Sequence, residues 1–265
     1  MNGPAVRAIL WLHTLAMGGA GLLFFLLPQQ GAAFWPWTLP PLAARFMASL
    51  FLGGAVCSLV FLRQRDGRAR SVLVLLALGD LLVALSGLLG IREIGPGAAT
   101  LRFVAFFSVF SLLLAVAALA MKHEMAGAGQ SRVPPALRAF FLIHLLVVLP
   151  VGVSMFFLPA WAQPLWPWRM TPINVRLIGS FFFGAAFISA WALRQANVRA
   201  LVAVLALYAA FATAATLASL LHLALFDPAR PVTWAFFALY VFVAAGSTLF
   251  LLQLTRNRNR AAAAA

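Results

Sequence analysis

The chain has 265 residues, of which 64% are hydrophobic and only 9% are charged. Soluble domains carry about 25% charged residues, so this composition excludes a soluble globular fold and indicates an integral protein of a lipid bilayer. The net charge of +14 would suggest nucleic acid in a soluble chain, but here most basic residues flank apolar runs, and we expect no nucleic-acid partner.

Apolar runs of about 20 residues recur along the chain, and a helix of that length crosses the hydrocarbon core of a bilayer. They predict an all-α polytopic fold with eight transmembrane helices, at 8–27, 42–62, 71–91, 102–121, 139–158, 173–193, 200–222 and 232–252. The first run shares its pattern with the fifth, so we expect it to remain in the mature protein and not to be cleaved as a signal.

The first span contains a histidine, His13, six residues after Arg7 and so about 9 Å into the membrane at 1.5 Å per residue. Ionisable side chains within a span are costly and are functional candidates. His144 of the fifth span stands in the same position relative to Arg138. The sequence leaves two interpretations: neutral histidines bonded to a neighbouring helix, or a pair that binds haem or a chlorophyll-type pigment.

A Trp-Pro-Trp segment, 28–41, follows the first span and carries Trp35 and Trp37 between two terminal prolines. The fifth span is followed by a similar segment with Trp166 and Trp168. Tryptophan prefers the headgroup level of a membrane, because its ring is apolar and its N–H needs a partner. We therefore expect all four rings to be interfacial anchors on a short, stiff ledge, with a lid or partner-docking surface as the alternative.

An arginine lies near the start of the second span, Arg45, and another near the start of the sixth, Arg176. A cation at a helix N-terminus is disfavoured by about 0.3–1 kcal/mol, so each guanidinium needs a compensating partner. That partner could be a lipid phosphate or the face of a tryptophan. Alternatively, the two arginines converge on one anion site.

The third span holds the only carboxylate in the middle of a span, Asp80, about 13 Å from the start of that helix at Ser71. Its depth is comparable to that of His13, which allows a pair between the two. One hypothesis is proton or cation coupling through Asp80. The alternative is a protonated Asp80 that hydrogen bonds a neighbouring helix or faces a partner subunit.

The second half of the chain repeats the first at an offset of 131 residues without a gap, which predicts two four-helix repeats, 1–122 and 138–256. A cytoplasmic linker, 123–137, joins them, and a cytoplasmic tail, 257–265, follows. Because each repeat has an even number of spans, both enter the membrane in the same orientation. A pseudo-twofold axis along the membrane normal is then expected to relate them.

The Trp-Pro-Trp segment of the second half continues as WPWRMTPINVRLIG, residues 166–179. This run resembles a W-P-W-x2-T-P-x3-R pattern of uncharacterised bacterial multi-pass membrane proteins, matched here by Trp166, Pro167, Trp168, Thr171, Pro172 and Arg176. The first half departs from the pattern, with Pro40 in place of Thr171. The resemblance implies a membrane fold and no particular activity.

Basic residues are distributed unevenly between the two sides of the predicted bundle. The side with both termini carries 13 of the 19 Lys and Arg residues, and the opposite side carries six. The positive-inside rule therefore predicts that both termini lie in the cytoplasm, with the protein in the cytoplasmic (inner) membrane.

The sequence contains few residues or motifs that are typical of catalysis. The sequence has no Gly-rich phosphate loop, no metal-spaced cluster and only five acidic residues, so we expect no enzyme, no catalytic residue and no metal site. Cys57, the only cysteine, excludes an intramolecular disulfide. The leading hypothesis is a membrane-complex scaffold or accessory subunit that packs against other subunits, itself, lipids or pigments. The alternatives are a transporter or channel for an anion or small amphipathic solute, and a haem- or pigment-binding protein.

Overall fold

The computed structural model describes residues 3–63, 70–121 and 132–263, and within these ranges the chain is helical without a β-strand. Eight helices are long and apolar enough to cross a membrane, as predicted. They are α1 (Pro4–Leu26), α3 (Pro41–Arg63), α4 (Arg70–Leu89), α6 (Ala98–Ala120), α7 (Pro135–Phe157), α9 (Pro172–Leu193), α10 (Val202–Leu221) and α11 (Pro231–Ala263). Most of the predicted linker lies outside the described residues, which resume at Arg132.

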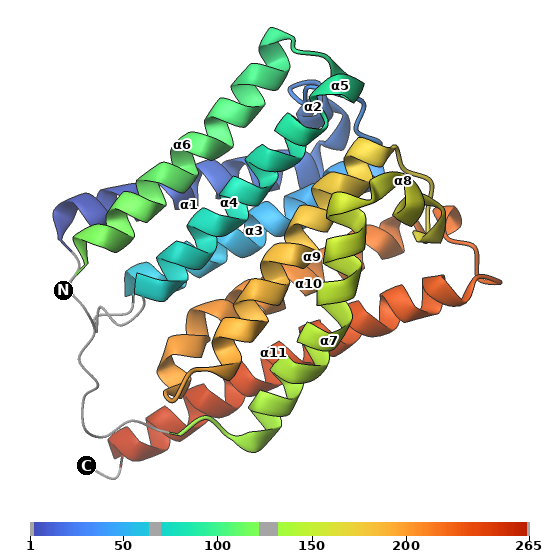
Figure 1. The fold of residues 1–265 in the computed structure, drawn as a ribbon. Coiled ribbons are helices and arrows are strands. Elements are labelled where there is room, and N and C mark those ends of the chain that lie inside the picture. Colours follow the sequence, from blue (N-terminus) through green and yellow to red (C-terminus); the bar gives the residue numbers. More distant parts are fainter. Residues whose placement is uncertain (1–2, 64–69, 122–131, 264–265) are drawn as a thin grey trace.

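The connections contain short helices: α2 (Pro28–Ala32), α5 (Ile91–Ile94), α8 (Pro159–Ala162) and the 3₁₀ turns η1 (Gln163–Leu165), η2 (Val198–Leu201) and η3 (Leu223–Leu225). Five of the long helices begin at a proline. Proline suits the first helical position, because its missing N–H would have no partner there and its φ angle is already helical. Helices α2, α5 and α8 lie at the end of the bundle opposite the start of α1, which we call the far end (Figure 1).

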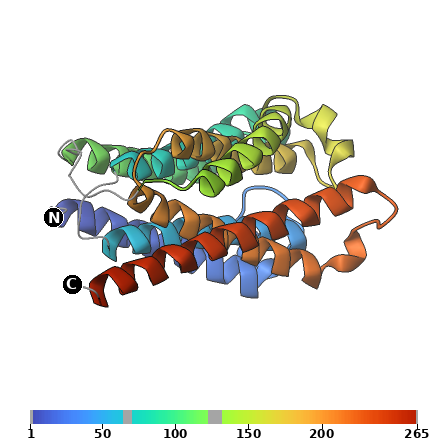
Figure 2. The same ribbon diagram turned by 90° about the horizontal axis from the view of Figure 1, so that it is seen from below.

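Helices from the two halves of the chain are interleaved. Helix α1 packs on α3, and α7 packs on α9 in the same way; α4 packs on α6, and α10 on α11. The contacts between the halves run from α3 to α10 and from α4 to α9. The start of α1 and the end of α11 lie at the same end of the bundle in both views (Figures 1 and 2). Each half therefore completes its packing only against helices of the other.

Two glycines allow the backbones of α7 and α9 to touch. A Cβ atom on Gly152 would lie 2.4 Å from the backbone N of Phe183, and one on Gly179 would lie 2.6 Å from the backbone N of Phe156. Small residues at such crossings permit the close approach that holds transmembrane helices together. The equivalent crossing of α1 and α3 is looser, since a Cβ on Gly21 would first meet the side chain of Leu52, at 2.8 Å.

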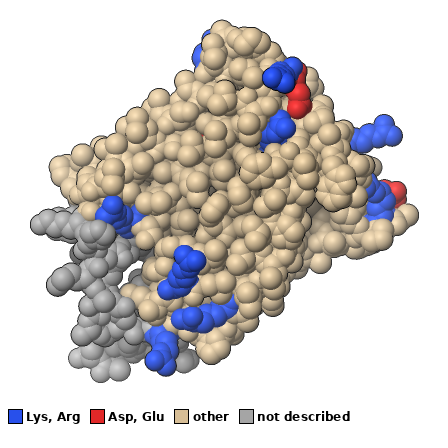
Figure 3. Space-filling model, in the orientation of Figure 1, with Lys and Arg blue, Asp and Glu red and all other residues tan. Residues whose placement is uncertain are grey.

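The surface matches a lipid environment. Large apolar side chains are exposed on seven of the eight long helices, all but α3, and include Leu15 of α1 at 67% and Leu146 of α7 at 66%. The visible face is mostly uncharged, with Lys and Arg side chains gathered towards the two ends of the bundle (Figure 3). Such a surface would be unstable in water and is expected within a bilayer.

Candidate functional site

A cavity of about 120 Å³ lies between the two halves of the chain, and all eight long helices contribute to its wall. Most of the lining is aliphatic or aromatic. The polar lining residues come from six different helices: His13, Asp80, His144, Ser180, Tyr208 and Tyr240. A mainly apolar cavity with a few convergent polar groups is the usual form of a small-molecule site.

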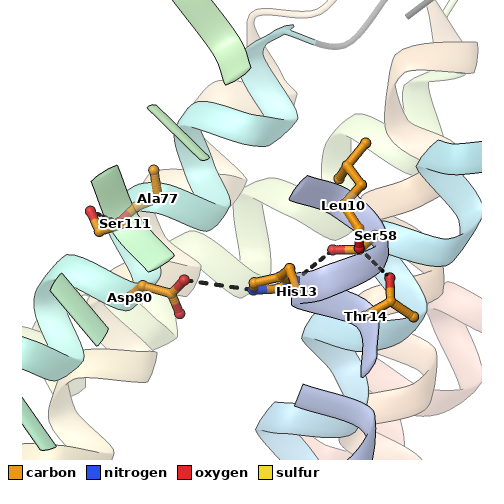
Figure 4. Close-up of polar contacts among 7 residues, drawn as sticks. All are labelled: Leu10, His13, Thr14, Ser58, Ala77, Asp80 and Ser111. Atoms are coloured by element: carbon orange, nitrogen blue, oxygen red, sulfur yellow. Dashed lines mark hydrogen bonds and ion pairs between the residues drawn. The ribbon is translucent and has the colours of Figure 1, made fainter. Parts of the chain in front are cut away.

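His13 and Asp80 face each other across this cavity wall (Figure 4). His13 Nε2 lies 3.6 Å from Asp80 Oδ2, a separation longer than a hydrogen bond but short enough for an ion pair whenever His13 is protonated. The other ring nitrogen, Nδ1, is 2.8 Å from Ser58 Oγ on α3. Ser58 can donate to Nδ1, which leaves the His13 proton on Nε2, facing the carboxylate.

The helices that carry this pair are held by further polar contacts. Ser111 Oγ on α6 donates to the carbonyl oxygen of Ala77, one turn before Asp80, at 2.8 Å (Figure 4). His13 is 2% exposed, so its position is fixed by the packing of α1 on α3. The carboxylate therefore stands at a defined place in the middle of α4, well inside the bundle.

Two buried polar atoms at the cavity have no hydrogen-bond partner among the described residues, Asp80 Oδ2 and Tyr240 Oη. Asp80 is 9% exposed and Tyr240 is 2% exposed. Leaving such a group unsatisfied costs about 1–3 kcal/mol, and more if it is charged. Asp80 Oδ2 has only the 3.6 Å contact to His13 Nε2, and both residues line the cavity, Asp80 with an acceptor and Tyr240 with a hydroxyl that can donate or accept.

His144 has the equivalent serine contact but different surroundings. Its Nδ1 is 2.8 Å from Ser189 Oγ, and both residues stand 131 positions after His13 and Ser58. Ser189 Oγ is also 3.1 Å from the Tyr208 hydroxyl, which donates to the carbonyl of Ala185 at 3.0 Å.

The proton positions in this second network follow from its last acceptor. A carbonyl oxygen can only accept, so the Tyr208 hydroxyl donates its proton to the Ala185 carbonyl. Ser189 must then donate to the Tyr208 oxygen. His144 Nδ1 then donates to Ser189, and a neutral His144 keeps Nε2 as an acceptor.

The two arginines at the far end, Arg45 and Arg176, have the same kind of first partner, a carbonyl at the C-terminus of a helix. Arg45 Nε donates to the carbonyl of Phe25 at 3.0 Å, and Arg176 Nε donates to that of Phe156 at 3.2 Å. These carbonyls lie in the last turn of α1 and of α7. The negative end of one helix dipole thus offsets the unfavourable start of another. A helix carbonyl thus takes the role for which the sequence suggests a lipid phosphate, a tryptophan face or a shared anion.

The second partners of the two arginines differ. Arg45 Nη1 donates to His222 Nε2 at 2.6 Å, whereas Arg176 Nη1 donates to Glu93 Oε1 at 3.4 Å. A guanidinium has no acceptor, so His222 accepts at Nε2 and is neutral in this arrangement. Burial, and secondarily the charge of Arg45, lower the pKa of His222 below its ordinary value.

The tryptophans of the second Trp-Pro-Trp segment are packed inside the protein. Trp166 is 7% exposed and Trp168 is 6% exposed, and both rings contact Phe46 and Phe236. A headgroup anchor needs an exposed ring, so the expectation of a lipid-facing ledge does not describe these two residues. Their rings instead fill a space among helices from both halves.

The tryptophans of the first segment are half-buried. Trp35 and Trp37 both pack edge-on against Phe103 of α6. Trp37 also donates from Nε1 to Asn174 Oδ1 of α9, at 2.8 Å. This contact joins the first segment to the second half of the chain, which an anchor acting on lipid alone would not do.

Sequence analysis missed the serine and tyrosine members of the cavity region. Ser58 and Ser189 recur at the 131-residue offset and could have been found through it. Tyr208 and Tyr240 are the only two tyrosines in the chain, and both line the cavity, but neither has a recurring partner. The described residues contain no group of His, Cys, Asp and Glu arranged to hold a metal ion.

Comparison of the chain with protein-family models, with curated proteins and with solved structures finds no match. The eight apolar helices define an integral membrane protein. Any finer assignment depends on the cavity and on the far-end arginines.

Proposed function

We propose that this protein is a transporter, and that it binds a small amphipathic solute with a cationic or hydrogen-bond-donating group in the central cavity. The observation that carries the proposal is the buried Asp80 carboxylate, which lines a cavity between all eight spans and has an oxygen without a hydrogen-bond partner. Substrate sites of many transporters lie at this position, near the midplane and between two halves.

The cavity volume limits the size of the solute. An engineered protein cavity of about 150 Å³ holds benzene, so a cavity of about 120 Å³ suits a single small ring or a short branched chain. Haem and chlorophyll-type pigments are far larger. The volume therefore favours the transporter over the pigment-binding alternative for His13 and His144.

Asp80 and His13 provide a means of coupling. A carboxylate beside a histidine can hold a proton or the cationic group of a solute, but it does not bind both strongly at once. Exchange between the two would link solute movement in one direction to proton movement in the other. This role explains why the pair persists inside a membrane, where ionisable groups are costly.

We further propose that the two halves are parallel repeats related by a pseudo-twofold axis, with both termini in the cytoplasm. The hydrogen bonds of His13 and His144, and of Arg45 and Arg176, recur at an offset of 131. The pairs of packed helices also correspond between the halves. The excess of basic residues on the side of the termini supports the orientation.

An accessory-subunit role is the leading hypothesis from the sequence, and it rests on the near-absence of polar groups within the spans. The cavity gathers those few groups at one place, which a passive scaffold does not require. The geometry therefore favours solute binding.

Three probes of similar size and different charge test the proposal: benzylamine, benzyl alcohol and benzoate. We expect benzylamine to stabilise the purified protein against heat most strongly, benzyl alcohol less, and benzoate not at all. In proteoliposomes loaded with a pH-sensitive dye, a benzylamine gradient should drive proton movement faster than in protein-free liposomes, where only the neutral amine crosses the bilayer. Asp80→Asn should abolish both effects, and Asp227→Asn, which changes an aspartate outside the cavity, should leave them unchanged.

Two outcomes would contradict the proposal. Equal stabilisation by all three probes would indicate nonspecific partitioning into detergent or protein. Benzylamine effects that survive Asp80→Asn would place binding elsewhere.

A further inference from the structure

A second hollow opens at the far end of the bundle, apart from the central cavity. It has a volume of about 390 Å³ and lies where α1 ends, α2 follows and α3 begins. We call it the Arg45 cleft. Its polar lining consists of Gln29, Gln30, Arg45 and His222.

The positive charge of Arg45 is not matched by a carboxylate in this cleft. Glu93 reaches Arg176, but the residue that reaches Arg45 is His222, which is neutral in that contact. No acidic residue belongs to the lining of the cleft, within the part of the chain that the structure describes. The charge of Arg176 is therefore neutralised by a carboxylate, whereas the charge of Arg45 is not.

Arg45 keeps donors for a ligand. A guanidinium has five N–H groups, and the contacts to Phe25 and His222 use one on Nε and one on Nη1. The remaining N–H groups on Nη1 and Nη2 can bind two oxygens of one phosphate, the arrangement that guanidinium forms best. The side-chain amides of Gln29 and Gln30 are further donors on the same wall.

The position of the cleft suits a phospholipid. Arg45 is the fifth residue of α3, about 6 Å from the start of a membrane-spanning helix, and so near headgroup level. Leu26 and Leu27 line the same cleft and are 66% and 50% exposed. An acyl chain can lie along these leucines while its phosphate contacts the arginine.

We propose that the Arg45 cleft binds a phosphate group, presented by a lipid headgroup or free in solution. The site is independent of the central cavity, and neither proposal requires the other. Arg45 is the principal ligand-binding residue, and Gln29 and Gln30 add hydrogen bonds. His222 adjusts the charge of the cleft, because a protonated His222 no longer accepts from Arg45 and becomes a donor itself.

Native mass spectrometry of the delipidated protein tests this proposal, with dioleoylphosphatidylglycerol as the probe and dioleoylglycerol as the matched lipid without phosphate. We expect the wild type to retain the phospholipid and not the diacylglycerol. Arg45→Gln should bind the phospholipid about tenfold more weakly, as expected for loss of a two-point charged contact. The matched control Arg176→Gln should bind like the wild type.

Inorganic phosphate distinguishes the two sources of the ligand. If phosphate alone raises the unfolding temperature of the wild type and not of Arg45→Gln, the cleft accepts a free anion. If only the phospholipid does so, the cleft is a lipid site; both outcomes support the proposal. Arg45→Lys keeps the positive charge and separates loss of binding from loss of folding, since it should fold and retain part of the affinity.

The proposal is overturned if wild type and Arg45→Gln bind the phospholipid and phosphate equally, or if neither probe binds the wild type. Equal losses in Arg45→Gln and Arg176→Gln would also overturn it, because the effect would then come from general surface charge.

Discussion

His13 and His144 make the same hydrogen bond to a serine, but their other ring nitrogens have different surroundings. Each histidine binds a serine 45 residues later, at 2.8 Å from Nδ1. Beyond that, His13 faces Asp80, whereas His144 lies beside the ring of Tyr208, 4.8 Å away between centroids. Phe211 occupies the position in α10 that corresponds to Asp80 in α4. The serine contact is common to both halves, whereas a carboxylate opposes the histidine in the first half alone.

The largest expected effect is a loss of folding stability when a glycine at a helix crossing is substituted. Gly152→Ala places a Cβ against the backbone of Phe183, which cannot move without shifting α9, and should cost about 3 kcal/mol or more. Gly21→Ala meets mainly the Leu52 side chain, which can change rotamer, and should cost about 1 kcal/mol. Thermal unfolding in detergent measures both, and equal losses would show that the two crossings are equally tight.

The next largest expected effect is on benzylamine affinity, when Asp80 or its counterpart Phe211 is substituted. Asp80→Asn should lower benzylamine affinity by about tenfold or more, because the cation loses its charged acceptor. Phe211→Leu should keep that affinity and admit the larger 4-methylbenzylamine, since it removes ring volume from the wall. Calorimetric titration measures both, and a loss of benzylamine binding in both variants would show that the cavity does not distinguish charge from size.

The serines sharpen the comparison of the two networks. Ser189→Ala breaks the contacts to His144 and Tyr208, and should cost about 2 kcal/mol. Ser58→Ala breaks the one contact to His13, and should cost about 1 kcal/mol. Chemical unfolding in mixed micelles can rank them, and the reverse order would mean that the interaction of His13 with Asp80 depends strongly on Ser58.

The smallest expected effect is a pH dependence at the Arg45 cleft. His222 is neutral at pH 7, because burial and then Arg45 lower its pKa, and protonation at lower pH adds positive charge. Phosphatidylglycerol keeps its charge while His222 titrates, so its affinity should rise severalfold as the pH falls below the ordinary histidine pKa of about 6.5. His222→Gln should flatten this rise while retaining binding through Arg45. A rise that persists in this variant would assign the titration to another group.

Features that depend on depth and hydropathy could be predicted from the sequence. The eight spans follow from run length, because a helix must cover a fixed thickness of hydrocarbon. The proximity of His13 and Asp80 follows in part from their common depth, although depth alone does not say which helices are neighbours. Helix ends differ from the prediction by a few residues, since prolines such as Pro135 begin helices before the apolar run does.

Features that depend on lateral neighbours could not be predicted. The sequence gives no sign that α3 packs on α10 and α4 on α9, because this arrangement reflects a match of side-chain shapes across the two halves. The helix carbonyls that bind Arg45 and Arg176 are present in every helix and carry no sequence signal. Trp166 and Trp168 were expected at the lipid interface from their residue type, but the aromatic side chains of other helices cover them.

The interleaving of the helices has a consequence for biogenesis. The partner of α3 is α10, whose first residue is made 139 residues after the last residue of α3. At about 5–20 residues per second, a ribosome needs roughly 7–30 s to supply it. During that interval α3 lacks its cover from α10, in which Phe211 and Leu207 are the nearest neighbours of Gly53. The first half therefore remains incompletely packed in the membrane until the second half is made.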